Sequence, residues 1–378
     1  MGSPRWVPEI NLLRGLAILG VVLDHCCMFF NKFEEVTLLS YSLISISVGN
    51  RIIPLFVIIS GFILTMNSQG GIREGFLKRR FMAVVPPYLF FSGVYLSIGH
   101  LVDGPLTASE AVFRVITGNV AHHMWFIVVI LQLYIVFPYL VRAYDRFNSV
   151  GRSLHFLVIV LGGQVLYNSL AAYLAAGSDS EMFSQSVGRL FVGTLFYFVL
   201  GIHILRHYRD FRTMLGKIDR LVAVKMAMLL VILALISGHL WIREYLQHGE
   251  FYGQFSTYRV AIILIDPCFA LLFFPLCFAL VLRAWGTSGL WCRVLDSLGN
   301  VSYGIYLSHM LAIYALVIAW GMLGVDFFDW YLYPILFISS VMLCYVVMRI
   351  IAPLPFSRYL IGNTKKREKF QRTKGPIG

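Results

Sequence analysis

The chain contains repeated, uninterrupted apolar runs, and this pattern limits its fold more than any other feature. A helix of about 20 apolar residues crosses the roughly 30 Å hydrocarbon core of a bilayer. A membrane β-barrel would instead alternate polar and apolar residues along each strand. The chain is 58% hydrophobic and only 13% charged, which is too little charge to cover a soluble protein of 378 residues. The sequence therefore predicts an all-α polytopic membrane protein.

The apolar runs predict about ten transmembrane helices separated by Gly/Pro-rich and charged loops. No fixed-period repeat divides the chain, so we expect one transmembrane domain over residues 1–355 and a basic cytoplasmic tail over 356–378. Residues 36–48 form either an interfacial helix or an extension of the second span. The spans are expected near residues 10–30, 49–67, 81–101, 123–141, 154–174, 189–206, 221–242, 260–282, 300–322 and 331–353.

The net charge of +12 would suit a nucleic-acid partner only if the basic residues shared one face, and they do not. Of the 31 Lys and Arg residues, 23 fall at the termini or in alternate loops on one side of the predicted bilayer, and six fall on the other side. Cytoplasmic loops carry such an excess. We therefore expect both termini in the cytoplasm, a multi-pass protein of the plasma (inner) membrane, and no nucleic-acid partner. Nothing in the pattern indicates an oligomeric state.

Two ionisable residues, Arg14 and His25, lie in the first apolar run. Such side chains are costly inside a bilayer, so each is a candidate functional residue. A spacing of eleven residues separates them by roughly 16 Å along a helix and places them on nearly the same face. Histidine is suited to accept and return a proton near neutral pH. The alternative is a structural histidine bonded to a backbone carbonyl, with an arginine that reaches the lipid headgroups.

A run of three basic residues, Lys78, Arg79 and Arg80, opens the third span. Such a run is most often a positive-inside anchor, and it can also clamp the phosphates of a ligand. No cysteine spacing indicates a zinc site, and we expect no metal.

Polar and aromatic residues also enter the fourth and ninth spans, at His123, Trp125, Tyr303 and His309. Trp125 can be an interfacial aromatic residue. His309 would lie about two turns into the bilayer, where an unpaired polar ring is unfavourable. Either an interhelical hydrogen bond or a ligand pocket would satisfy it.

Five stretches of the chain stand out when they are taken in order: NLLRGLA (11–17) with His25 as an R-x10-H motif, LFVIISGF (55–62), KRRF (78–81) with PPY (86–88), H-x-W-F (123–126) and VSYGIYLSH (301–309). Together they resemble the acyltransferase-3 family. Asn11 stands where that family often has an acidic residue, and Ala83 or Val84 replaces a later arginine of its basic stretch.

The resemblance implies a membrane O-acyltransferase that uses acyl-CoA, with acetyl-CoA as the expected donor, and a carbohydrate or glycoside acceptor. It implies that His25 is a general base supported by Arg14, and that Lys78, Arg79 and Arg80 hold the donor phosphates. The expected substrate-binding residues are Ser60, His123, Trp125, Tyr303 and His309. A transporter or flippase for polysaccharide or lipid-linked sugar is the alternative, because it too needs polar residues in a channel.

Overall fold

The structure is a computed structural model that describes residues 7–27, 52–147, 150–176, 178, 183, 186–248, 257–285, 289–325 and 332–362. Across these ranges all regular secondary structure is helical, as predicted. The predicted interfacial segment 36–48 lies outside the described residues, as does most of the predicted tail. The first part of that tail forms the short helix α14 (Ser357–Leu360), which packs against α3.

Eight described helices are long and apolar enough to cross a membrane. A ninth results if η2 (Phe191–Thr194) and α8 (Leu195–Arg206) are joined with α9 (Tyr208–Gly216), which follows an 88° bend. The shorter apolar helix Ile52–Asn67 occupies the remaining predicted span. The eight are α1 (Glu9–Cys27), α3 (Phe76–Val102), α5 (Trp125–Asp145), α6 (Val150–Ala176), α10 (Arg220–His248), α11 (Thr257–Trp285), α12 (Leu290–Met322) and α13 (Leu332–Ile351).

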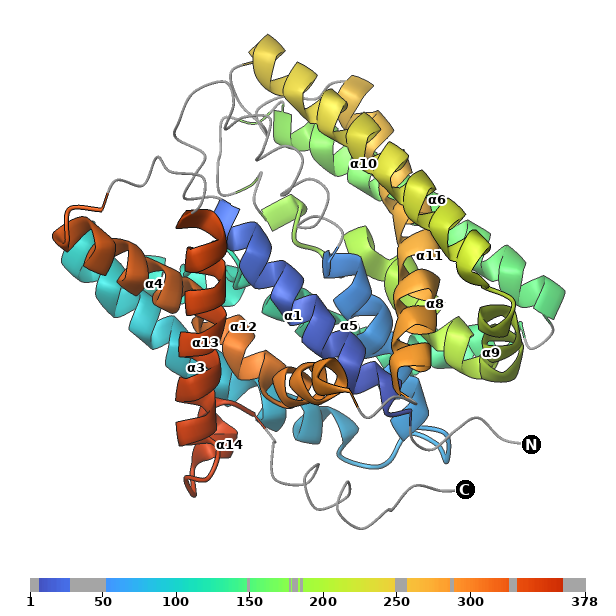
Figure 1. Cartoon of the computed structure of the whole chain (residues 1–378), viewed down its shortest axis with the longest axis horizontal. Coiled ribbons are helices and arrows are strands. Elements are labelled where there is room, and N and C mark those ends of the chain that lie inside the picture. The colour runs from blue at the N-terminus through green and yellow to red at the C-terminus, as the bar shows by residue number, and fades with distance from the viewer. Residues whose placement is uncertain are drawn as a thin grey trace.

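Helix α1 crosses the middle of the molecule, with α3, α4 (Ala108–Thr117) and α13 on one side and α6, α8, α10 and α11 on the other (Figure 1). Most of its residues are buried, from Glu9 at its start to Cys27 at its end. Its main partner is α12. Because Asn11 contacts Asp296 while His25 contacts His309, the two helices run in the same direction.

Two glycines let α1 and α12 approach until their backbones touch. A Cβ on Gly15 would lie 2.1 Å from the carbonyl oxygen of Leu295, and a Cβ on Gly299 would lie 2.1 Å from that of Asn11. Real Cβ atoms do not approach a backbone so closely, so no other residue fits without moving a helix. Small residues serve the same purpose in other membrane helix pairs.

An amide–carboxylate cluster joins α1 to α12 beside these glycines. Asn11 Nδ2 donates to the backbone carbonyl of Asp296 at 2.9 Å, to its Oδ1 at 2.8 Å and to Asn300 Oδ1 at 3.1 Å. Asn300 Nδ2 lies 3.4 Å from Asp296 Oδ2. These bonds fix the register of α12 against α1, and that register determines which α12 residues meet His25.

Two short helices form in loops where the sequence predicted none. Helix α4 begins with a capping box, in which Glu110 N donates to Thr107 Oγ1 at 3.3 Å and Thr107 N donates to Glu110 Oε2 at 2.9 Å. Helix α9 buries Tyr208, Phe211 and Leu215 on one face and exposes its basic residues on the other. The spacing of its buried residues is that of an amphipathic helix.

Candidate active site

His25 lies near the end of α1, where its ring is held by its own helix. Its Nδ1 is 2.8 Å from the backbone oxygen of Val21. A carbonyl oxygen can only accept a hydrogen bond, so Nδ1 carries the proton and the neutral ring keeps a lone pair on Nε2. The tight α1–α12 contact described above sets the position of this ring relative to α12.

The turn before α5 supplies a second histidine, and a glycine makes that turn possible. Gly118 ends α4 in the left-handed region at φ 73°, and a Cβ there would lie 2.5 Å from Trp125 Cα. The chain can therefore fold back against the start of α5. His123, five residues after this glycine, is consequently buried inside the bundle with 2% of its surface exposed.

Three histidine rings from distant parts of the chain meet at this point. The ring centroids of His25 and His309 are 4.9 Å apart, those of His123 and His309 are 4.5 Å apart, and those of His25 and His123 are 6.0 Å apart. Tyr306 donates its hydroxyl to the carbonyl of His123, and Tyr95 of α3 lies 5.5 Å from the His123 ring. We call His25, His123 and His309 the histidine cluster.

Several ring nitrogens of the cluster have no hydrogen-bond partner among the described residues. His309 Nδ1 donates to the carbonyl of Tyr306 at 2.7 Å, and its Nε2 has no hydrogen-bond partner among the described residues. Neither nitrogen of His123 has a partner there either. A buried polar atom without a partner costs about 1–3 kcal/mol. A polar ligand that entered the cluster would recover that free energy, so the cluster is a candidate binding site.

Burial keeps the His123 ring uncharged near neutral pH. Burial, followed by the neighbouring rings of His309 and His25, lowers the pKa of His123 well below its usual value. His25 is 9% exposed, whereas His309 is 0% exposed, so His25 is the more accessible of these two rings. A neutral, slightly accessible imidazole can accept a proton from a hydroxyl.

The structure gives the other predicted site residues their own surroundings. Arg14 is half-buried three turns before His25 on α1. Ser60 is half-buried on the helix Ile52–Asn67, and no hydrogen bond among the described residues joins it to the three rings. Tyr303 donates its hydroxyl to the carbonyl of Val84 at 2.7 Å, which binds α12 to α3. Trp125 packs against Phe126, next in sequence to the turn that carries His123.

The predicted phosphate-binding residues lie at the start of α3. Lys78 and Arg79 are exposed, and Arg80 is half-buried with its guanidinium 5.6 Å from the centre of the Phe76 ring. Arg79 Nη1 donates to the carbonyl of Glu74 at 2.6 Å, so it also holds the loop before α3. The partners of Arg79 and Arg80 in the part of the chain that the structure describes are in this region and not in the cluster, and the role of the run in donor binding stays a prediction.

The comparison with known families decides the identity. Residues 7–349 match the acyltransferase-3 family, which is described as an acyltransferase domain. The chain belongs to the acyltransferase-3 family. It is therefore a multi-pass membrane enzyme that transfers acyl groups, and this assignment favours catalysis over the transport alternative.

A curated relative of this acyltransferase is the putative membrane-bound acyltransferase YfiQ of Bacillus subtilis (strain 168). The two chains are 25% identical over 314 residues, which cover 80% of each. No solved structure matches this acyltransferase.

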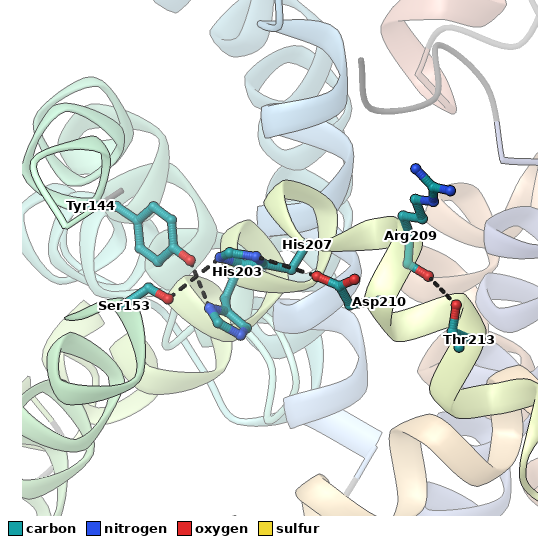
Figure 2. A network of polar contacts seen from close by, with 7 residues as sticks. All are labelled: Tyr144, Ser153, His203, His207, Arg209, Asp210 and Thr213. Carbon is teal, nitrogen blue, oxygen red and sulfur yellow. Dashed lines mark hydrogen bonds and ion pairs between the residues drawn. The ribbon is translucent and has the colours of Figure 1, made fainter. Parts of the chain in front are cut away.

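A second polar network lies where α8 meets α9, and the sequence pattern had not indicated it (Figure 2). Tyr144 Oη is 2.6 Å from His203 Nδ1, and Ser153 Oγ is 3.4 Å from His207 Nε2. The rings of His203 and His207 have centroids 4.7 Å apart. The spacing of the two histidines, four residues apart and thus on one helix face, was the available signal.

Proposed function

We propose that this acyltransferase moves an acyl group, with acetyl as the expected case, from cytoplasmic acyl-CoA to a hydroxyl of a carbohydrate or glycoside. His25 is the general base in this proposal. The observation that carries it is the hydrogen bond from Nδ1 to the Val21 carbonyl, because that bond leaves the Nε2 lone pair to accept a proton. The plasma (inner) membrane is the proposed location.

The proposed reaction has a simple balance of bonds and protons. His25 Nε2 takes the proton of the acceptor hydroxyl while the hydroxyl oxygen forms a bond to the thioester carbon. The carbon–sulfur bond then breaks, and the CoA thiolate takes the proton from His25. The negative charge that develops on the thioester oxygen needs a hydrogen-bond donor. His123 suits this role because its ring must carry one N–H, which has no partner among the described residues.

The donor is proposed to reach His25 from the end of α1 that carries Arg14. Lys78, Arg79 and Arg80 would hold its phosphates, and an extended pantetheine arm would pass Arg14. The rise of a helix separates Arg14 from His25 by roughly 16 Å, which is of the order of such an arm. In this arrangement the charged phosphates never cross the bilayer. Trp125 is suited to packing against the sugar ring of an acceptor near the opposite end.

Proteoliposomes with one uniform orientation test this proposal. Acetyl-CoA labelled in its acetyl group is added on the side of the termini, and a glycoside acceptor is enclosed on the other side. Transfer of label to the enclosed glycoside is the expected result. Product that forms only when donor and acceptor share a side would overturn the transmembrane arrangement. An absence of transfer from any CoA thioester, with active protein shown by another donor, would overturn the donor assignment.

A further inference from the structure

The bend between α8 and α9 forms one wall of a pocket that the proposed reaction does not use. This pocket has a volume of about 390 Å³, within the range of ligand sites, and residues of α11 line its other side. Its lining is mostly apolar, with Leu200, Ile204, Phe211, Leu271 and Phe274 among the side chains. His203, His207 and Asp210 are the polar residues in the lining. We call it the elbow pocket.

The order of Ser153, His207 and Asp210 in the polar network suggests a nucleophilic triad at first sight (Figure 2). The geometry does not support one. Ser153 is 0% exposed and does not line the pocket, and His207 Nδ1 lies 3.9 Å from Asp210 Oδ2, beyond hydrogen-bond distance. The network therefore binds α5 and α6 to the bend and makes that wall of the pocket rigid.

The elbow pocket opens toward the hydrocarbon region. Leu271 is 43% exposed in the middle of the spanning helix α11, and Met214 of α9 is also 43% exposed. The 88° bend makes α9 nearly perpendicular to α8. A short amphipathic helix perpendicular to a span lies in the headgroup region of the bilayer. The pocket thus runs from the headgroup level into the apolar layer.

The charge around the pocket favours an anionic group at its mouth. Residues 206–220 contain five basic and two acidic side chains. Arg206 is paired with Asp145 at 2.8 Å, and Arg212 lies 3.8 Å from Glu9. Arg209 is exposed and has no acidic partner within ion-pair distance among the described residues. Asp210 is the charged residue of the lining, and Arg209, the next residue before it, lies on the exposed face of α9 beside the pocket rather than in its lining. Exposed basic residues at the headgroup level attract anionic lipid headgroups.

We propose that the elbow pocket binds an anionic phospholipid from the leaflet that faces α9. One acyl chain lies along the apolar lining between α8 and α11, and the phosphate lies at the exposed face of α9 near Arg209. This site is separate from the histidine cluster, and its occupancy does not depend on the proposed reaction.

Lipid retention by the purified, delipidated full-length protein tests the proposal. Phosphatidylglycerol and phosphatidylcholine with identical chains are added separately, and bound lipid is counted by native mass spectrometry. Phosphatidylglycerol should be retained in preference to phosphatidylcholine. Arg209→Gln should lower that preference about five-fold, as expected from about 1 kcal/mol per arginine near an anionic lipid. Arg358→Gln, which removes an exposed arginine on α14, should leave it unchanged.

Variants that fill the pocket distinguish lipid binding in the pocket from nonspecific lipid binding to the protein surface. Leu271→Trp and Met214→Trp each place a large side chain in the lining, and both should reduce phosphatidylglycerol retention to the level of phosphatidylcholine. Leu264→Trp changes an equally lipid-exposed leucine of α11 outside the pocket and should have no effect. Equal retention of the two lipids by the unmodified protein would overturn the proposal. So would displacement of bound phosphatidylglycerol by acyl-CoA, which would make the pocket part of the donor path.

Discussion

The rings of His25 and His309 meet edge to face with centroids 4.9 Å apart, and each ring donates its Nδ1 proton to a carbonyl of its own helix. Both neutral rings therefore hold a lone pair on Nε2, and neither can donate to the other. These lone pairs need a hydrogen-bond donor from elsewhere. A hydroxyl group is such a donor, and this is the chemical reason why the pair suits an acceptor that must lose a proton.

The role of His25 can be tested against a histidine with the same local bond. His25→Ala should lower acyl transfer by about 10²–10⁴-fold, which is the usual loss for a general base. The matched control is His155→Ala, because His155 Nδ1 also lies 2.8 Å from the carbonyl four residues earlier, but on an exposed face. Initial rates on correctly inserted protein are the measurement. Equal rates for the two variants would make His25 a structural residue.

Asn11 occupies a position that favours an amide over a carboxylate. Asn11→Asp would place a second carboxylate against Asp296 Oδ1, now 2.8 Å from the donating amide, and should lower thermal stability in detergent. Adding Asp296→Asn restores a donor to the pair and should recover most of the loss. The coupling free energy for such neighbours is about 0.5–3 kcal/mol. Strictly additive effects of the two substitutions would show that the cluster does not hold α1 against α12.

Gly299 should tolerate no side chain. In Gly299→Val the Cβ would overlap the carbonyl oxygen of Asn11, so α12 must move away from α1. We expect a loss of stability of at least about 1–3 kcal/mol, as for overpacked cores, together with a loss of activity. Gly93→Ala on α3 is the control, since nothing lies within 4 Å of its added Cβ. Thermal unfolding of both variants in detergent decides the matter, and a Gly299→Val protein as stable as the control would contradict the contact.

The stability of the protein should depend on pH through His123. Its folded-state pKa lies below the unfolded value of 6.5, because burial disfavours the charged ring. The unfolded chain therefore binds this proton first as the pH falls. The titration of His123 therefore leaves the free energy of unfolding unchanged above about pH 6.5 and lowers it below that pH. His123→Gln removes this titration, so its melting temperature should fall less between pH 6.5 and pH 5 than that of the unmodified protein. Parallel curves for the two proteins would show that His123 takes no part.

The predicted orientation can be checked at two short helices. A single cysteine at Asp210 of α9 should react with a membrane-impermeant reagent only from the cytoplasmic side, and one at Ser109 of α4 only from outside. Both positions are exposed. Cys268 and Cys292, which are not buried, are replaced by serine beforehand. External labelling at position 210 would reverse the orientation and, with it, the side proposed for the donor.

Hydropathy predicted the spans because a bilayer requires each crossing segment to form all of its backbone hydrogen bonds internally, as an apolar helix does. It could not predict which spans touch, since every span is apolar on most faces. The meeting of His25 with His309 depends on Gly15 and Gly299, whose importance appears only when the two backbones are seen together. The same limit applies to the tyrosines of α12. Only the structure shows that Tyr306 lies against His123 while Tyr303 donates to the carbonyl of Val84, and the predicted role of Tyr303 in substrate binding stays a prediction.

The contact between α1 and α12 also has a consequence for how the enzyme is made. Ribosomes release the chain from its N-terminus, so α1 enters the membrane long before its main partner has been translated. Until α12 emerges, Gly15 and Asn11 face lipid or provisional neighbours. The histidine cluster thus comes into existence only near the end of synthesis. A chain that stops before residue 309 carries His25 but not the His309 ring that meets it in the folded protein.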